Sequence, residues 1–484
     1  MRAIPPLTAL AACLAAALGV ASPAARAVNR TVTQCGDSGA GSLRAAVASA
    51  SNLGDTIVFD IAQMACSKIT LTSGQIVVNA QTLTVQGPGS ALLTVSGNSG
   101  DYAHASRVFF DRANDATGYT RQLTINDLTI SEGLAHANAA AIIRGGCVDA
   151  SGDVTLIRAV VTGCIVENFD QAGQANGGGI NARSLHMSYS TISNSSAGGS
   201  SATVGGAASI DGAIDIRFSR IIGNGTATGN PQLAPGSGGG IASFGQAGGD
   251  IRIIASTLAG NQADRGGALY VSVPVGAGPM ALTIDHSTIS GNHAEVASGA
   301  VQLYDSNAHM TAIILDSTIS GNNSSQFTGG VFSTASQLTV SNSTIAFNTA
   351  AASSGPTIAS GLYSSGVTIL QSVILAKNLN NGPSDLGGSS TFSGSGNLIM
   401  ATVGGAVSPV GSLTADPQLG GLADNGGMTL THALPNGSPA IGSGNNLGHL
   451  ASDQRGAGFA RMTGNKTDIG AFQHGDGIFA AGFE

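Results

Sequence analysis

The sequence predicts an all-β protein whose chain winds into a right-handed parallel β-helix, a solenoid, with a short capping helix near its N-terminus. The first observation is repetition, because the segment LTIDHSTISGN at 282–292 returns in several recognisable copies. The second is the period: successive copies lie 26 to 37 residues apart, which is typical of a solenoid coil. The third is composition. The 71 glycines have no collagen-like period, and regularly placed β-branched residues argue against disorder.

Residues 1–27 are predicted to be a secretory signal peptide. Arg2 gives the segment a positive start, 7–20 is apolar, and the ARA triplet at 25–27 fits a cleavage site. A lipoprotein signal that ends at Cys13 is the alternative. We therefore expect a chain that is secreted or held at the outer membrane or cell surface. No later segment is apolar over about eighteen residues, so no transmembrane helix is expected in the mature chain.

The charge balance argues against nucleic acid as a partner. The chain has 19 Lys and Arg residues against 27 Asp and Glu residues, a formal net charge of −8 at pH 7. The predicted signal peptide contains arginines and no acids, so its removal makes the chain more acidic. Neutralising phosphates needs an excess of Lys and Arg, and we therefore expect no nucleic-acid partner.

Four cysteines follow the predicted signal peptide: Cys35, Cys66, Cys147 and Cys164. An even number in an exported chain favours disulfides, and three pairings are possible. Because contacts in a solenoid are local, we predict that Cys35 bonds Cys66 and that Cys147 bonds Cys164. A zinc site is the rival interpretation, but the sequence has no C-x-x-C and no histidine pair near the cysteines.

Residues 28–106 are predicted to be the N-terminal cap and the first coils. Ser42 is a good N-cap, and the apolar residues after it have helical spacing, which predicts a helix that ends at about Ser51. Such a helix would cover the exposed edge of the first coil, which otherwise invites aggregation. Apolar clusters and alternation predict short strands at 31–33, 56–59, 69–71, 75–78 and 83–85.

Residues 107–400 are predicted to be the repeats. Leu282 and Ile284 share one face of a strand, and Ser287 and Ile289 share one face of the next. The odd step from Ile284 to Ser287 predicts a bend that lets both pairs point inward. The position of Ile284 is filled in other copies by Ile125, Leu156, Met187, Ile216, Ile253, Ile314, Val340 and Ile369. The position of Ile289 is filled by Ile130, Val161, Ile192, Ile221, Leu258, Ile319, Ile345 and Ile374.

Two polar positions repeat as well. The position of Ser287 is serine again at Ser190, Ser219, Ser256, Ser317, Ser343 and Ser372. No histidine repeats beside these serines, so they are predicted to form a row of hydroxyls at the bend and not a catalytic array. A second position holds Cys164 and Ser195 in early copies and then Asn224, Asn261, Asn292, Asn322 and Asn348. Stacked asparagines are predicted to form a structural ladder that satisfies buried backbone groups from coil to coil.

A variable loop follows each of these positions and ends in two glycines and an apolar residue. Glycines there allow a tight turn into a further strand of the same coil. Each coil is therefore expected to hold about three short strands. The pairs are Gly145-Gly146, Gly178-Gly179, Gly239-Gly240, Gly266-Gly267 and Gly329-Gly330.

Together these features resemble the bacterial right-handed parallel β-helix repeat proteins. The resemblance rests on the export signal, the GSLRAAVASA segment at 41–50, the STISGN coils and the GGAL-type turns. A narrower resemblance, to the repeats of polymorphic outer-membrane proteins, rests on the Gly-Gly-apolar turns and the Phe-Asn pair at 347–348. A leucine-rich repeat is the structural alternative, but its leucine-asparagine signature and helix are absent. The resemblance implies a fold and leaves the activity open.

Residues 401–474 are predicted to be C-terminal coils with an anchor-like module, and 475–484 a short tail. The segment DPQLGGLADNGGMTLTHALPNGSPAIGSGN from Asp416, followed by DQRG and DIGA, resembles the module called choice-of-anchor Q. That module precedes diverse surface-sorting tails, so the resemblance implies a role in attachment to the cell surface.

The same segment has a second interpretation, a terminal cap. Asp453 or Asp468 would then pair with Arg455 or Arg461. Both interpretations can hold together, and neither makes these residues catalytic.

Parallel β-helices also include pectate lyases and polygalacturonases, so an enzyme is the alternative to a binding role. A lyase needs clustered carboxylates for calcium with an Arg or Lys base, and a hydrolase needs paired carboxylates. The motifs N-T-D, D-D, G-H-G and R-I-K that are typical of polygalacturonases are absent. The nearest approach to G-H-G is Gly448-His449-Leu450.

Calcium is the one ion that the loops suggest. Asp264 and Glu295 each lie three residues past a ladder asparagine, so adjacent coils could bring the two carboxylates together. The alternative is a solvated turn in which Arg265 pairs with one acid. His286 and His293 have no second ligand at metal spacing and are interpreted as surface histidines.

The sequence therefore favours an exported β-helix with a binding or adhesion role over an enzyme. Its partner is an unknown surface ligand, with carbohydrate as a candidate class. No catalytic residue is identified, and no cofactor beyond calcium at Asp264 and Glu295. A polysaccharide lyase or glycoside hydrolase of the pectate-lyase-like class is the alternative.

Overall fold

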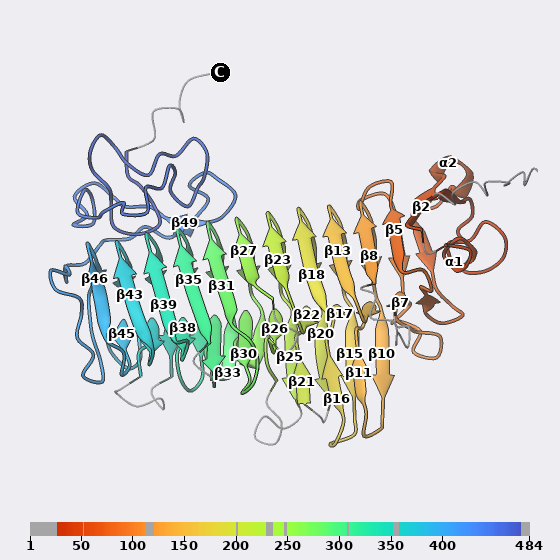
Figure 1. Ribbon diagram of the computed structural model, residues 1–484, viewed down its shortest axis with the longest axis horizontal. Coiled ribbons are helices and arrows are strands. Elements are labelled where there is room, and N and C mark those ends of the chain that lie inside the picture. Colours follow the sequence, from red (N-terminus) through yellow and green to blue (C-terminus); the bar gives the residue numbers. More distant parts are fainter. Residues whose placement is uncertain are drawn as a thin grey trace, which may run out of the picture.

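The computed structural model describes residues 27–51, 53–111, 121–199, 202–228, 236–245, 249–306, 309–351 and 358–475. These residues form a parallel β-solenoid whose coils stack along one axis (Figure 1), which confirms the predicted fold class. The described part contains no helix that is long and apolar enough to cross a membrane. The predicted signal peptide up to residue 26 and the tail beyond Gly475 lie outside the described residues.

Three long parallel sheets, named A, B and C here, run the length of the solenoid, with 13, 12 and 11 strands. Sheet A consists of β1 (Asn29–Val32), β2 (Asp55–Phe59), β5 (Thr82–Gln86), β8 (Gln122–Asn126), β13 (Asp153–Ile157), β18 (Ser184–Ser188), β23 (Ile214–Arg217), β27 (Ile251–Ile254), β31 (Met280–Asp285), β35 (Met310–Leu315), β39 (Gln337–Ser341), β43 (Val367–Gln371) and β46 (Phe392–Ser395). Sheet B consists of β3 (Lys68–Thr70), β6 (Thr94–Ser96), β9 (Thr129–Ser131), β14 (Val160–Thr162), β19 (Thr191–Ser193), β24 (Arg220–Ile222), β28 (Thr257–Ala259), β32 (Thr288–Ser290), β36 (Thr318–Ser320), β40 (Thr344–Ala346), β44 (Ile374–Ala376) and β47 (Leu398–Ile399). Sheet C consists of β4 (Ile76–Val77), β7 (Phe109–Asp111), β12 (Val148–Ala150), β17 (Ile180–Ala182), β22 (Ala208–Ile210), β26 (Ile241–Ser243), β30 (Leu269–Val273), β34 (Val301–Asp305), β38 (Val331–Ser333), β42 (Leu362–Ser364) and β45 (Leu386–Gly387).

Many coils contain further strands, between sheets B and C, that the sequence did not predict. Eight of them form sheet D, and three more form a short sheet beside it. Sheet D consists of β10 (Leu134–Ala137), β15 (Ile165–Asn168), β20 (Ser196–Gly199), β25 (Gly225–Thr228), β29 (Gln262–Arg265), β33 (His293–Ala297), β37 (Asn323–Ser324) and β41 (Thr349–Ala350). The short sheet consists of β11 (Ile142–Arg144), β16 (Gln174–Asn176) and β21 (Ala202–Val204). Small buried residues such as Ala263 and Ala294 face inward there, and two to five residues give too short a pattern to predict.

Two short helices lie at the N-terminal end of the solenoid (Figure 1). The predicted one, α1 (Leu43–Ala48), begins as expected, because Ser42 accepts a hydrogen bond from Ala45 N, but it ends before Ser51. Its Leu43, Ala46 and Val47 side chains are buried in the core. The second helix, α2 (Ile61–Met64), was not predicted, since a single turn leaves no periodic pattern.

Both disulfides have the predicted pairing. Cys35 bonds Cys66 near the N-terminal cap, and Cys147 bonds Cys164 inside the core. Cys164 occupies the ladder position in its coil, where its backbone N–H donates to Ser195 Oγ.

The bend between sheets A and B requires a left-handed residue in most coils. His286, for example, has a φ of 49°, and Ser287 follows it with its side chain buried. Except at Ser372, each serine hydroxyl then accepts a hydrogen bond from the equivalent backbone N–H of the preceding coil, as from Ser256 N to Ser287 Oγ and from Ser287 N to Ser317 Oγ, both at 3.1 Å. The serines are structural, because they satisfy buried amides at the bend.

The predicted register is wrong by one residue in the last repeat. Strand β43 pairs with β39 so that Leu370 lies opposite Val340, and Leu375 lies opposite Ile345. Ile369 therefore faces outward, and Ser372 is the left-handed corner residue, with a φ of 53°. A one-residue slip exchanges the two faces of a strand, and apolar residues alternate ambiguously in this strand. Buried Thr368, which bonds Ser364, takes the inward place that a hydrophobic residue fills elsewhere.

The asparagine ladder runs through the corner between sheets B and D. Asn224, Asn261, Asn292, Asn322 and Asn348 are all buried, and each accepts at Oδ1 from the coil before it. At Asn292, the backbone N–H and Nδ2 both donate to Asn322 Oδ1, at 3.0 and 2.8 Å. The ladder also extends beyond the residues named from the sequence, to Asn378 and then Asp385.

The predicted module at 401–474 has little regular structure, with only the hairpin β48 (Leu422–Ala423) and β49 (Thr431–His432). Residues 401–413 bridge to β45 and β47 and so continue the solenoid past its last coil. The later residues of the module lie along the outer side of sheet B in the last coils, beside the solenoid (Figure 1). The outward threonines Thr288, Thr318 and Thr344 are therefore buried, whereas Thr191 and Thr257 of earlier coils remain partly exposed.

Candidate functional site

A groove of about 410 Å³ lies on the outer side of sheets C and D, away from the C-terminal module. Its lining is mainly aromatic and apolar, with one guanidinium group and one side-chain amide. The residues are Arg265, Tyr270, Val296, Ala297, Gln302, Tyr304, Phe327 and Phe332. A few polar groups within an apolar, aromatic lining are typical of sites that bind small organic ligands.

The parallel register stacks the aromatic residues into a row. Tyr270, Gln302, Phe332 and Tyr363 are direct partners on β30, β34, β38 and β42. Successive strands lie about 4.8 Å apart, so these side chains stand one above the next along the solenoid. The rings of Phe332 and Tyr363 are nearly parallel, at 2°, with centroids 5.3 Å apart. The rings of Phe332 and Tyr363 therefore stack on each other along the solenoid, and Gln302 separates them from Tyr270.

Gln302 is the polar centre of the groove. Its side chain is 7% exposed, and Oε1 has no hydrogen-bond partner among the described residues. A buried amide oxygen without a partner costs about 1–3 kcal/mol. A ligand that donates a hydrogen bond in the groove would remove this cost.

Among the described residues of the lining, Arg265 carries the only charge. It forms no ion pair within the described residues, although a pair with a neighbouring acid was the alternative expected for this loop. No Asp, Glu or His is in the lining. The groove thus has groups that bind an anion or a polar ligand, and no carboxylates for acid–base chemistry.

The predicted calcium candidates, Asp264 and Glu295, lie next to residues that line this groove. Asp264 is buried, and its Oδ2 accepts from Gly236 N at 2.5 Å. Glu295 is exposed and lies 3.0 Å from His293 Nε2. The pairing of β29 with β33 shifts register between Ala263 and Arg265, so Asp264 and Glu295 are not register partners.

The aromatic row was missed because it is not a repeat of the residues that fill the core. A signal exists, since each member follows a small-residue turn and one inward apolar residue. The letters GAL precede Tyr270, and GV precedes Phe332. Tyr363 follows GL in the same way. A search for aromatic residues directly after those turns would have found the row.

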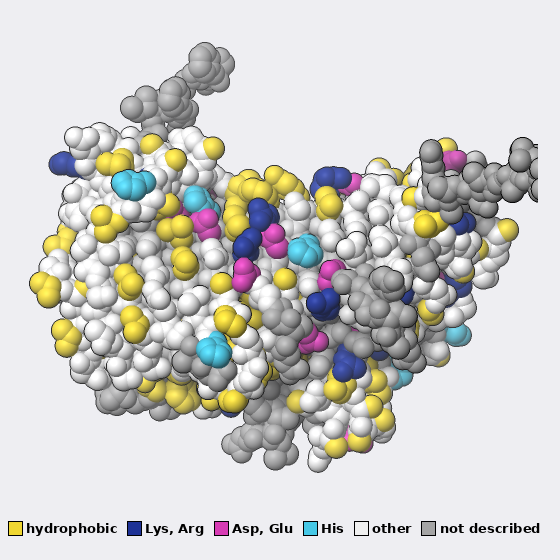
Figure 2. Space-filling model, viewed as in Figure 1, with side chains coloured by type: hydrophobic (Ala, Val, Ile, Leu, Met, Phe, Trp, Pro, Cys, Tyr) yellow, Lys and Arg dark blue, Asp and Glu magenta, His cyan; other side chains and the backbone are white. Residues whose placement is uncertain are grey.

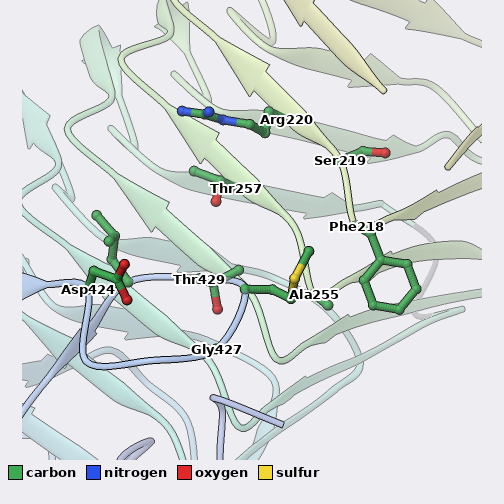
Figure 3. Close-up of a pocket in the computed structure, with 10 residues that line it drawn as sticks. Phe218, Ser219, Arg220, Ala255, Thr257, Asp424, Gly427 and Thr429 are labelled. Atoms are coloured by element: carbon green, nitrogen blue, oxygen red, sulfur yellow. The ribbon is translucent and has the colours of Figure 1, made fainter. Parts of the chain in front are cut away.

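A second cavity, of about 290 Å³, lies where the C-terminal module ends on sheet B (Figure 3). Arg220 and Thr257 of the solenoid lie on one side, and Asp424 and Thr429 of the module lie on the other. Phe218 stacks on Tyr189 at its edge, with ring centroids 4.9 Å apart. Figure 2 shows hydrophobic side chains beside charged ones at this step between the module and the solenoid.

A cluster of ionisable groups lies at the joint between the solenoid and the module. Arg461 is fully buried and donates from Nη1 to Asp316 Oδ1 at 3.2 Å. Burial raises the pKa of Asp316 to about 7. Asp285 and His286 lie against Asp316, with His286 Nδ1 2.6 Å from Asp285 Oδ1. His286 is thus half-buried among acids, and not an isolated surface histidine as expected.

One of the ion pairs predicted for the module forms within one turn, whereas Arg461 pairs with Asp316 of the solenoid and not with Asp453 or Asp468 as expected. Arg455 Nη2 lies 2.6 Å from Asp453 Oδ2, and the guanidinium carbon of Arg455 lies about 4 Å from the ring centroids of Phe459 and Phe472. Asp468 instead accepts from the backbone N–H groups of Gly442 and His474. These residues are buried structural groups of the module.

No protein-family model matches the chain, and neither the curated proteins nor the solved structures include a significant match to it.

Proposed function

We propose that this protein binds carbohydrate at or outside the cell surface, and that the groove on sheets C and D is the binding site. The observation that carries the proposal is the row of Tyr270, Gln302 and Phe332, in which aromatic side chains on the neighbouring strands flank a buried amide without a partner for Oε1. Sugar rings present C–H faces that pack on aromatic rings, and hydroxyl groups that donate to an amide oxygen. The groove combines both features.

The shape of the row favours a polymer. It continues beyond the groove to Tyr363, whose ring is parallel to that of Phe332. A chain of sugars lying along the solenoid axis would contact successive rings, each on a different coil. Single sugars would contact only part of this surface, so affinity is expected to rise with chain length.

Arg265 favours sugars that carry carboxylates. A guanidinium group binds a carboxylate through two parallel hydrogen bonds, and no acid in the lining competes for it. We therefore propose acidic polysaccharides as the preferred class.

Export and surface attachment belong to the same proposal. They are supported by the signal-like segment at 1–27 and by the resemblance of 401–474 to the choice-of-anchor Q module. Fractionation of producing cells tests this part. The chain is expected in the medium or with the outer membrane, and recovery in the cytoplasm would contradict it.

Binding is tested with oligomers of uronic acids and of neutral sugars, measured by calorimetry on the purified chain. Phe332→Ala and Gln302→Ala are each expected to weaken binding about tenfold, which corresponds to about 1.4 kcal/mol. Arg265→Gln should weaken binding of acidic oligomers alone. Phe169→Ala is the matched control, since Phe169 is an exposed aromatic outside the groove. Equal binding by the Phe332 and Phe169 variants would rule the groove out.

The alternative function, a polysaccharide lyase, is tested by a separate experiment. Incubation with acidic polysaccharides and calcium is expected to give no unsaturated product, because the groove contains no acid–base pair. Turnover that is lost in Asp264→Ala would replace the binding proposal with an enzymatic one.

A further inference from the structure

The ionisable cluster at the joint lies at the corner between sheets A and B, a position that recurs from coil to coil. His286 and Asp316 are equivalent corner residues of successive coils, both with positive φ, at 49° and 38°. Asp285 directly precedes His286 at the end of β31. The stacking of coils thus brings residues 30 positions apart in the sequence to one point on the surface between sheets A and B.

The three side chains offer a compact set of ligand atoms. One imidazole nitrogen and two carboxylate oxygens, from Asp285, His286 and Asp316, all lie within 4.8 Å of one another. Asp316 is fully buried, whereas Asp285 and His286 keep 23% of their side-chain surface exposed. Solvent therefore reaches one side of the cluster and provides a path of entry.

Asp316 gives an independent sign that a ligand belongs here. Its Oδ1 accepts from Arg461 Nη1, but its Oδ2 is buried and has no hydrogen-bond partner among the described residues. A buried carboxylate oxygen is expected to be paired or to coordinate a metal. The other members of the cluster are the nearest groups that could share such a metal.

We propose that Asp285, His286 and Asp316 form a binding site for a divalent transition-metal cation of the zinc type. One imidazole and two carboxylates suit this class better than calcium or magnesium, which prefer oxygen ligands alone. Zinc lies roughly 2.0–2.2 Å from such ligands, so ligand atoms around one ion are at most about 4 Å apart. The side chains need only a small closing movement from their present separation.

Three protein ligands leave a fourth position on the solvent side. Arg461 remains on Asp316 Oδ1, where it orients the carboxylate, as partners of metal ligands commonly do. The cation would then join two coils directly, and the C-terminal module indirectly through Arg461. Its effect is to fix the module to the solenoid.

The full chain, freed of metal with a chelator and dialysed, is titrated with Zn²⁺, and bound zinc is measured by elemental analysis. His286→Asn is the principal variant, because asparagine occupies the equivalent corner at Asn342 with a positive φ and is therefore compatible with the fold. Asp316→Asn is the second variant, since it keeps an acceptor for Arg461. The control is His293→Asn, which alters a partly exposed histidine that also lies beside an acid.

The wild-type chain and the His293 variant are expected to bind one zinc ion per chain and to gain thermal stability from it. The His286 and Asp316 variants should bind at least about 10- to 100-fold more weakly, because this is the loss known for residues that only orient a metal ligand, and they should gain no stability. The site would be disproved by equal zinc affinity in the wild-type chain and the His286 variant. Absence of stoichiometric binding, or a preference for Ca²⁺, would disprove it as well.

Discussion

Thr318 Oγ1 donates a hydrogen bond to Oε1 of Gln454 at 2.6 Å, which links a residue of the repeat to one in the C-terminal module 136 positions later. On its other side Gln454 donates from Nε2 to Thr288 Oγ1 at 3.0 Å, so a single amide spans two coils. Both threonines repeat in the sequence, but among the described copies only Thr288, Thr318 and Thr344 bond the module.

Replacement of Gln454 by Ala should loosen the module. The change leaves the hydroxyls of Thr288 and Thr318 buried with fewer partners, and about 1–3 kcal/mol of unfolding free energy should be lost. Denaturant unfolding measures this loss, and limited proteolysis should show earlier cleavage within 401–475. Gln337→Ala, at an exposed position of β39, is expected to change neither readout. Identical results for the two variants would mean that the amide does not hold the module.

Replacement of Asn292 by Ala should destabilise the solenoid by about 2–3 kcal/mol, because it removes the acceptor for Asn261 N from a buried ladder. The neighbouring Asn323→Ala removes an exposed side chain and is expected to cost less than about 0.5 kcal/mol. Chemical denaturation of both variants compares the two positions. A cost at Asn323 as large as that at Asn292 would argue against the ladder as the source of stability.

Asp385, at the end of the ladder, should make stability depend on pH. Burial raises its pKa to about 6 from an ordinary value of 3.8, so the folded chain holds this proton more tightly than the unfolded chain. The stabilising contribution is therefore complete below about pH 4 and is lost as the pH rises through about 6.

Asp385→Asn keeps an oxygen that can accept from Asn378 Nδ2 and removes the ionisation. At pH 7 the variant should be more stable than the wild type, by at most about 3 kcal/mol, and the difference should vanish near pH 4. Urea unfolding at several pH values measures it. A variant that is less stable than the wild type at pH 7 would show that Asp385 is ionised and well solvated in the folded chain.

Loss of the buried disulfide should destabilise the first repeats. Cys147 and Cys164 enclose a short loop with a sequence separation of 17, for which loop entropy predicts about 3 kcal/mol. Paired replacement of both cysteines by Ser should lower the unfolding free energy by about this amount, measured by denaturation without reductant. No change would indicate that packing of the stacked coils alone fixes this loop.

The repeating part of the fold could be predicted because each coil places the same kinds of residue at the same positions. Inward apolar residues such as Ile284 and Ile289, and the ladder asparagine Asn292, recur at fixed spacing, so sheets A and B can be recognised from the sequence. The prediction was wrong at Ile369, where a polar residue, Thr368, faces the core and both registers look equally apolar. Local pattern alone could not choose between them.

The site and the joint could not be predicted in the same way. The groove depends on Gln302 being placed between Tyr270 and Phe332, residues that share a strand position but no chemical type. The joint depends on Arg461 reaching Asp316 across 145 positions, for which no repeat provides a signal. The groove and the joint both depend on residues that differ between coils, and a repeat pattern records only what the coils share.

The position of the module along sheet B also sets an order of assembly during synthesis. Within the part of the chain that the structure describes, coils up to β28 bond only to coils that are near in the sequence, so each can fold as soon as the next has emerged from the ribosome. Thr288, Thr318 and Thr344 instead wait for partners between Thr429 and Ala471, which are made more than a hundred residues later. The last coils therefore complete their hydrogen bonds only when the chain is almost fully synthesised. In a nascent or prematurely ended chain, the outer side of sheet B is left uncovered in these coils and is open to association with other chains.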